Sequence, residues 1–153
     1  MFSKDEKKAF KQLFWTSFGK FMSKHESVSG QKVNWSNYKT RIKDLYVRLE
    51  VDTKKASFAI EFQHTDEGIR QLFFDQFKEL KTVFHSIMGD NLEWIQVDEQ
   101  QHKIISKISE DLPGVNIYNK NTWEDAFPFF EKHMVNFDEF WSEFSELFVI
   151  LQD

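Results

Sequence analysis

The sequence predicts a single α+β domain in which an antiparallel sheet of two hairpins, with four to five strands, carries three helices mainly on one face. Three observations predict this class. Apolar residues recur at helical spacing in three segments, two pairs of alternating segments lie between them, and turn residues separate the members of each pair. The expected order is helix, hairpin, helix, hairpin, helix, and 153 residues suit one domain spanning 1–153.

The first helix is expected to begin after Ser3 and to end near Lys24. Ser3 and Glu6 stand at the spacing of a capping box, in which each side chain bonds the main-chain N–H of the other residue. Residues 25–34 have no periodicity and are expected to form a loop. One apolar stripe runs along the helix and consists of Phe10, Leu13, Phe14, Phe18, Phe21 and Met22.

Two alternating segments, 45–51 and 57–63, predict the first hairpin, with a turn at Asp52-Thr53-Lys54-Lys55 between them. A slip of one residue would move every apolar side chain to the other face, so the apolar pattern specifies the register. The expected partners are Leu49 with Phe58, Val47 with Ile60 and Leu45 with Phe62.

A second helix is expected from about Asp66 to Met88, with Gly89 ending it. The segments 92–97 and 103–108 then predict a second hairpin around a turn at 98–102. Residues 115–118 are compatible with a fifth, short edge strand.

The last helix is expected to start at Thr122, with Asp125 three residues on, and to bend or restart near Pro128. The apolar positions of this helix form a seam that can pack against the sheet of the same chain or against a second copy, so both monomer and homodimer stay open. The width of the seam favours packing against the sheet. Its apolar positions are Phe127, Phe130, Met134, Phe137, Trp141, Phe144, Phe148 and Leu151.

The composition sets limits on function. Eighteen Phe and five Trp predict a bulky aromatic core. The absence of Cys excludes disulfides and thiolate metal sites, and the five scattered Gly exclude phosphate-cradling loops. No cofactor is predicted. No long apolar run or secretory signal is present, so we expect a cytoplasmic protein without membrane contact. Residues 1–55 carry a net charge of +7 and residues 56–153 a net charge of −12, which predicts a dipolar surface.

Three polar residues, Asp44, Glu61 and Gln63, are expected on the outward face of the first hairpin. An Asp followed by Glu-x-Lys on the next strand is the metal-binding core of restriction-endonuclease-like nucleases, and here Gln63 stands in the lysine's place. Asp44 and Glu61 would hold the ion and Gln63 would orient the attacking water. The alternative is an ordinary polar sheet surface, in which Arg48 pairs with Glu61.

A second hypothesis is nucleic-acid binding through basic residues with aromatic residues near them. The alternative is a charged helix face and a loop whose aromatic residues fill the core. The five His form no HxxxH or HExxH pattern, so no zinc site is predicted. The basic candidates are Lys4, Lys8, Lys11, Arg41, Lys43 and Arg48, and the stacking candidates are Trp35, Tyr38 and Tyr46.

Four short segments carry a resemblance to a known family: Leu13-Phe14-Trp15-x-x-Phe18, Tyr46-Val47-Arg48-Leu49-Glu50, Leu92-Glu93-Trp94 and Asn121-Thr122-Trp123. Together they resemble a bacterial domain family of unknown function. The resemblance implies a compact α+β module in a DNA-processing or defence setting, because members often follow a nuclease-like segment; it names no catalytic residue. We therefore expect a non-catalytic module that binds protein or nucleic acid, with a metal-dependent nuclease as the alternative.

Overall fold

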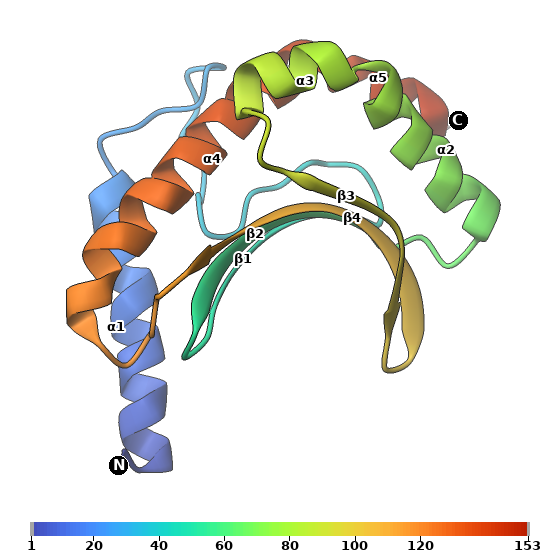
Figure 1. The fold of residues 1–153 in the computed structure, drawn as a ribbon. Coiled ribbons are helices and arrows are strands. Elements are labelled where there is room, and N and C mark those ends of the chain that lie inside the picture. Colours follow the sequence, from blue (N-terminus) through green and yellow to red (C-terminus); the bar gives the residue numbers. More distant parts are fainter. Residues whose placement is uncertain (1, 153) are drawn as a thin grey trace.

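The computed structural model describes residues 2–152, and these contain one antiparallel sheet of four strands (Figure 1). The order across the sheet is β1-β2-β4-β3, so β1 and β3 are the edges. The sheet is strongly curved, and its concave face carries no described helix (Figure 1). The strands are β1 (Leu45–Val51), β2 (Lys55–Phe62), β3 (Glu93–Gln100) and β4 (Lys103–Pro113).

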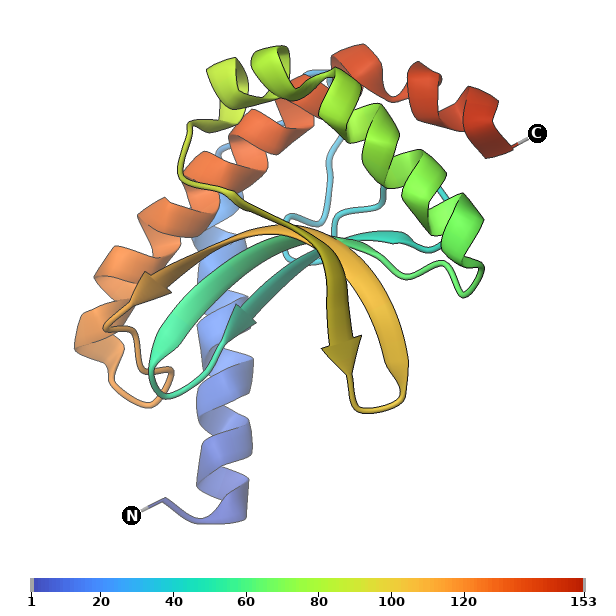
Figure 2. The same ribbon diagram turned by 45° about the vertical axis from the view of Figure 1, so that its right-hand side comes forward.

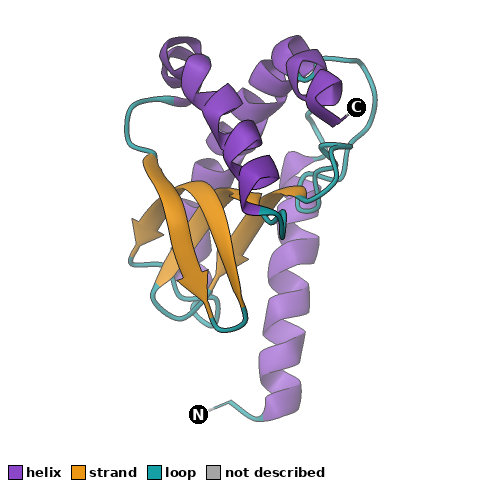
Figure 3. Cartoon of the chain, turned by 90° about the vertical axis from the view of Figure 1, so that its right-hand side faces the viewer, coloured by secondary structure: helices purple, strands orange, loops and turns teal. Residues whose placement is uncertain are grey.

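The described residues form five α-helices, and the expectation of three was therefore wrong. Helices α2 to α5 lie over the convex face of the sheet (Figures 1 and 2). The helix that starts at the N-terminus packs against α4 and extends past the sheet (Figure 3). The helices are α1 (Lys4–Met22), α2 (Glu67–Glu79), α3 (Lys81–Met88), α4 (Trp123–Phe144) and α5 (Glu146–Val149), with 3-10 turns at Lys120–Thr122 and Ile150–Gln152.

The predicted second helix is divided at Leu80, which leaves the helical conformation with φ −94° and ψ 11°. Phe77 and Phe84, on either side of the break, are both fully buried, and their rings meet edge to face at 5.9 Å. The break therefore turns the chain so that both rings reach the same core.

The register predicted for the first hairpin is confirmed at all three apolar pairs, from Leu49↔Phe58 to Leu45↔Phe62. The turn is built by Asp52, whose carboxylate accepts main-chain hydrogen bonds from Lys54 at 2.7 Å and Lys55 at 2.8 Å. Both bonds favour the ionised carboxylate and lower the pKa of Asp52.

The second hairpin differs from its prediction because its strands are longer and its turn is shorter. β3 continues to Gln100, and the register shifts by one residue between Ile95 and Asp98. This bulge interrupts the alternation on which the sequence prediction depended. The expected fifth strand was also wrong: after Gly114, with φ +84°, residues 115–118 contain no strand, and Ile117 and Tyr118 lie in a turn.

The core is aromatic, as the composition predicted. Phe77 shows how it is built, because its ring joins the sheet to the helices around it. Most Phe side chains of the last helical seam are completely buried within this chain, which confirms the intramolecular interpretation of their packing. The rings within 6.5 Å of Phe77 are Phe62, Phe84, Phe140, Trp141 and Phe148.

Helix α4 begins differently from the prediction. The Thr122 hydroxyl makes no capping bond to the helix; it donates instead to the carbonyls of Asn116 and Asn119. A 3-10 turn therefore leads into the helix, which continues through Pro128 without a break. Among residues 2–152, no helix combines the length and apolarity that crossing a membrane requires.

Candidate functional site

The segment before β1 is held against the protein by alternate residues. Tyr38, Thr40 and Ile42 are buried. The Tyr38 hydroxyl donates to the Asp138 carboxylate at 2.6 Å, and the Trp141 indole N–H donates to the Thr40 carbonyl at 3.1 Å. Both partners belong to α4, so this segment is fixed although it has no regular secondary structure.

The residue that follows each of these three anchors is basic and exposed: Lys39, Arg41 and Lys43. Together with Arg48 of β1, they line a groove of about 550 Å³ beside the outer edge of the sheet. No carboxylate lines this groove, and none of the four cations forms an ion pair within the part of the chain that the structure describes. The groove is therefore a local concentration of uncompensated positive charge in a chain of net charge −5.

Arg48 contacts an aromatic ring and not the carboxylate that was expected. Its guanidinium lies 4.4 Å from the centroid of the Tyr46 ring. No ion pair between Arg48 and Glu61 is found among residues 2–152, so the predicted surface pair was wrong. Tyr46 is partly exposed and also lines the groove, so the groove contains one stacked aromatic–cation pair.

Two of the three aromatic residues proposed for stacking are buried. Trp35 is 5% and Tyr38 is 9% exposed, so neither can offer a ring face to a ligand. Burial, helped by the neighbouring Asp138 carboxylate, raises the pKa of the Tyr38 hydroxyl, which stays protonated as a hydrogen-bond donor. The prediction of stacking by these two residues was wrong, and the alternative, a loop whose aromatic residues fill the core, is confirmed.

The six predicted basic residues fall into two groups. Arg41, Lys43 and Arg48 meet in the groove. Lys4, Lys8 and Lys11 are exposed on the N-terminal half of α1, which extends beyond the sheet, and they do not line the groove. Their role in binding stays a prediction.

The predicted metal-binding residues line three different hollows: Asp44 one, Glu61 a second and Gln63 a third. The Gln63 amide donates to the Glu61 carboxylate at 2.7 Å, and Lys103 donates to the Gln63 carbonyl oxygen at 2.9 Å. Asp44, with φ +63°, lines a separate pocket that includes neither Glu61 nor Gln63. Within residues 2–152, no three His, Asp or Glu side chains are placed to hold one metal ion.

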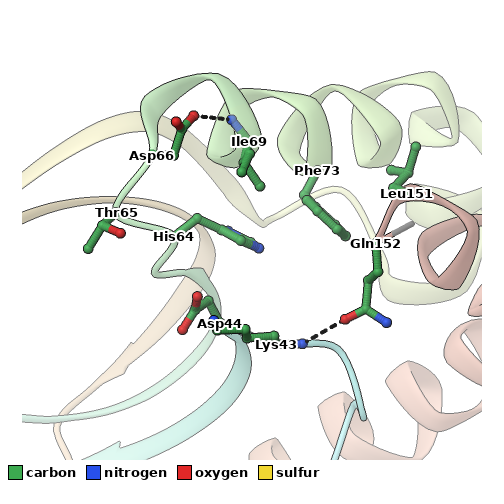
Figure 4. Close-up of a pocket in the computed structure, with 9 residues that line it drawn as sticks. All are labelled: Lys43, Asp44, His64, Thr65, Asp66, Ile69, Phe73, Leu151 and Gln152. Carbon is green, nitrogen blue, oxygen red and sulfur yellow. Dashed lines mark hydrogen bonds between the residues drawn. The ribbon is translucent and has the colours of Figure 1, made fainter.

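The pocket beside Asp44 has a volume of about 270 Å³ (Figure 4). His64, at the end of β2, is 6% exposed, and its ring stacks on Phe73 of α2 at 4.7 Å. Neither ring nitrogen makes a well-formed hydrogen bond to a described residue, although the Lys43 main chain lies near the ring. Burial lowers the pKa of His64, although the Asp44 carboxylate and the Lys43 main chain act in the other direction. The imidazole is therefore neutral near pH 7. The lining residues are Lys43, Asp44, His64, Thr65, Asp66, Ile69, Phe73, Leu151 and Gln152.

One residue of the groove, Lys39, and one residue of the pocket, His64, were not predicted as site residues from the sequence. Lys39 belongs to the groove, and the alternation of basic with buried residues along 38–43 is a signal that could have found it. His64 had no comparable signal, because its surroundings come from residues as distant in sequence as Lys43 and Gln152.

One comparison with known proteins gives a match, to a family of protein domains. Residues 10–145 match the family described as "Domain of unknown function (DUF4268)". The match covers most of the chain, so the protein belongs to this family, and the predicted resemblance to a domain family of unknown function is confirmed. No curated protein matches the chain. No solved structure matches it either.

Proposed function

We propose that this domain is a binding module that holds single-stranded nucleic acid in the groove beside β1. The observation that carries the proposal is the lining of that groove: Lys39, Arg41, Lys43 and Arg48, with no carboxylate. Phosphate groups carry one negative charge each, and contacts to them supply most of the sequence-independent affinity for nucleic acid.

A single strand fits the groove better than a duplex for two reasons. The groove lies along the edge of a single strand, β1, and Tyr46 with Arg48 forms a stacking platform inside it. Proteins that bind single strands combine such a basic groove with aromatic faces on which bases stack. The anchoring of Tyr38 and Thr40 supports the proposal further, because a main chain that is already fixed loses less conformational entropy when the cations that it carries bind phosphate.

The setting of this activity is also a proposal. The resemblance noted from the sequence implies a bacterial module in DNA processing or defence, the lack of a secretory signal or long apolar run favours the cytoplasm, and binding of single strands suits that setting. Lys4, Lys8 and Lys11 would add a second contact along α1.

Fluorescence anisotropy with a labelled 20-nucleotide oligo(dT) tests the proposal. The double variant Arg41→Gln/Lys43→Gln should weaken binding about tenfold, since two of four phosphate contacts are lost. The control Lys120→Gln/Lys132→Gln removes the same charge from exposed sites outside the groove and should change the affinity less than about twofold. Equal effects of the two variants would show that only the total charge matters.

The metal-dependent nuclease is the alternative, with Asp44 and Glu61 as ligands and Gln63 orienting water. Titration calorimetry with Mg²⁺ or Mn²⁺ addresses it separately from nucleic-acid binding. Binding heat that Glu61→Ala abolishes would favour the nuclease, and no binding heat in the unmodified protein would remove it.

A further inference from the structure

The pocket beside Asp44 adjoins the basic groove, and Lys43 lines both. Its walls come from the residues just before β1, the residues that join β2 to α2, the first half of α2 and the C-terminal 3-10 turn. The Lys43 main-chain N–H donates to the Gln152 side-chain oxygen at 3.1 Å, which fixes the C-terminal turn against the segment that carries the groove (Figure 4). A strand lying in the groove would therefore pass the mouth of this pocket.

His64 is the first sign that the pocket has an occupant. Figure 4 shows its ring pointing toward the middle of the pocket. Buried polar atoms in proteins are nearly always hydrogen-bonded, and neither nitrogen of this buried ring makes a well-formed hydrogen bond to a described residue, although the Lys43 main chain lies near the ring. A neutral imidazole offers one donor and one acceptor, so it suits a ligand that presents both.

Asp44 is the second sign. Its backbone lies in the left-handed region, with φ +63°, which is uncommon for a residue other than Gly. Its carboxylate makes no hydrogen bond or ion pair with another described residue. The carboxylate of Asp66, by contrast, is already used to cap α2 through the N–H of Ile69 at 2.9 Å. Asp44 is thus an acceptor available to a ligand.

The remaining walls define the shape and charge of the ligand. Ile69, Phe73 and Leu151 form an apolar side against which a flat body could pack. The two carboxylates outnumber the one cation, Lys43, among the lining residues, and the imidazole is uncharged, so a phosphate group is better placed with the four cations of the groove. The best match is a flat heterocycle with N–H donors for a carboxylate and a mixed donor–acceptor edge.

We infer that the pocket binds one unstacked nucleobase carrying an exocyclic amino group, with Asp44 accepting from that amino group. This inference rests on the proposed binding of a single strand in the groove: the backbone contacts Lys43 and Arg41 while one base turns into the pocket. Cytosine and uracil provide the matched pair, because an amino group in one replaces a carbonyl oxygen in the other.

Fluorescence anisotropy with labelled dC10 and dU10 tests the inference. The unmodified protein should bind dC10 about tenfold more tightly, the discrimination typical of a well-placed pair of base contacts. Asp44→Asn should reduce the preference to less than about twofold without straining the backbone, since Asn tolerates the left-handed region. Equal binding of the two oligonucleotides by the unmodified protein would overturn the inference.

A matched pair of variants on α2 separates the pocket from general effects on folding. Ile69 and Leu72 are 48% and 46% exposed on the same helix, but only Ile69 lines the pocket. Ile69→Trp should fill the pocket and abolish the preference, whereas Leu72→Trp should leave it intact. A preference that survives Ile69→Trp would place the base elsewhere and overturn the inference.

Failure of the proposed function would be recognised separately. If neither oligonucleotide binds, the groove proposal fails, and the pocket is judged with free nucleotides by NMR titration. Resonance shifts at His64 with cytidine monophosphate, stronger than with uridine monophosphate and lost in Ile69→Trp, would uphold the pocket. No shift with either nucleotide would overturn it.

Discussion

Replacing Tyr38 by Phe removes one hydroxyl from the anchor that holds the groove segment against α4. Asp138 is 1% exposed and accepts three hydrogen bonds: from the Ser27 hydroxyl at 2.8 Å, from the Val28 N–H at 2.8 Å and from the Tyr38 hydroxyl at 2.6 Å. The variant keeps the ring, which meets Phe137 edge to face at 5.6 Å, and so isolates the hydrogen bond from the packing.

The expected loss of stability follows from the charge of the acceptor. A hydrogen bond to a charged group contributes about 1.5–3 kcal/mol, and here the carboxylate keeps only two of its three donors in a buried site. A loss of about 2 kcal/mol corresponds to a fall in Tm of about 6 °C for a chain of this length. Urea unfolding followed by tryptophan fluorescence gives the free energy, because the chain has five Trp.

Tyr118→Phe is the matched control. The Tyr118 hydroxyl makes no hydrogen bond with any residue that the structure describes, so its removal should cost less than about 0.5 kcal/mol. If Tyr38→Phe is no more destabilising than this control, Asp138 is not the anchor of the loop, and the rigidity invoked for the groove has no basis.

Two further predictions concern His64 and two Gly residues. The folded pKa of His64 lies below its ordinary value of 6.5, so just below pH 6.5 the unfolded chain binds more protons than the folded chain. The free energy of unfolding therefore decreases as the pH is lowered through this range, by at most about 1.4 kcal/mol per pH unit. In urea unfolding at pH 5 to 8, His64→Phe should gain relative stability as the pH falls; a constant difference would contradict this. Gly19→Ala, in open space on α1, should stabilise by about 0.5–1 kcal/mol, whereas Gly114→Ala, at φ +84°, should destabilise by about 1 kcal/mol. Thermal melts showing the reverse order would be inconsistent with these conformations.

The features that could be predicted from the sequence depend on neighbours in the chain. The register of the first hairpin was predictable because the alternation and the Asp52 turn are both local. The break at Leu80 was not, because the apolar spacing runs through it unchanged, and only the packing of Phe77 and Phe84 in one core requires the bend. The bulge after Ile95 likewise depends on the pairing of β3 with β4.

The candidate site divides in the same way. Arg41, Lys43 and Arg48 were predictable as basic residues, and their meeting in one groove depends on the anchoring of Tyr38 to a helix 100 residues away in sequence. Asp44 was expected to share a face with Glu61, but its positive φ interrupts the alternation on which that expectation depended, and it lines another pocket.

The salt dependence of binding tests the central claim most directly. With four groove cations each contacting a phosphate, log K for oligo(dT) should fall against log salt concentration with a slope of about −2.8, or about −0.7 per contact. The variant Arg41→Gln/Lys43→Gln should bring the slope to about −1.4, and Lys120→Gln/Lys132→Gln should leave it unchanged. An affinity that does not depend on salt, or the same slope in all three proteins, would contradict the account.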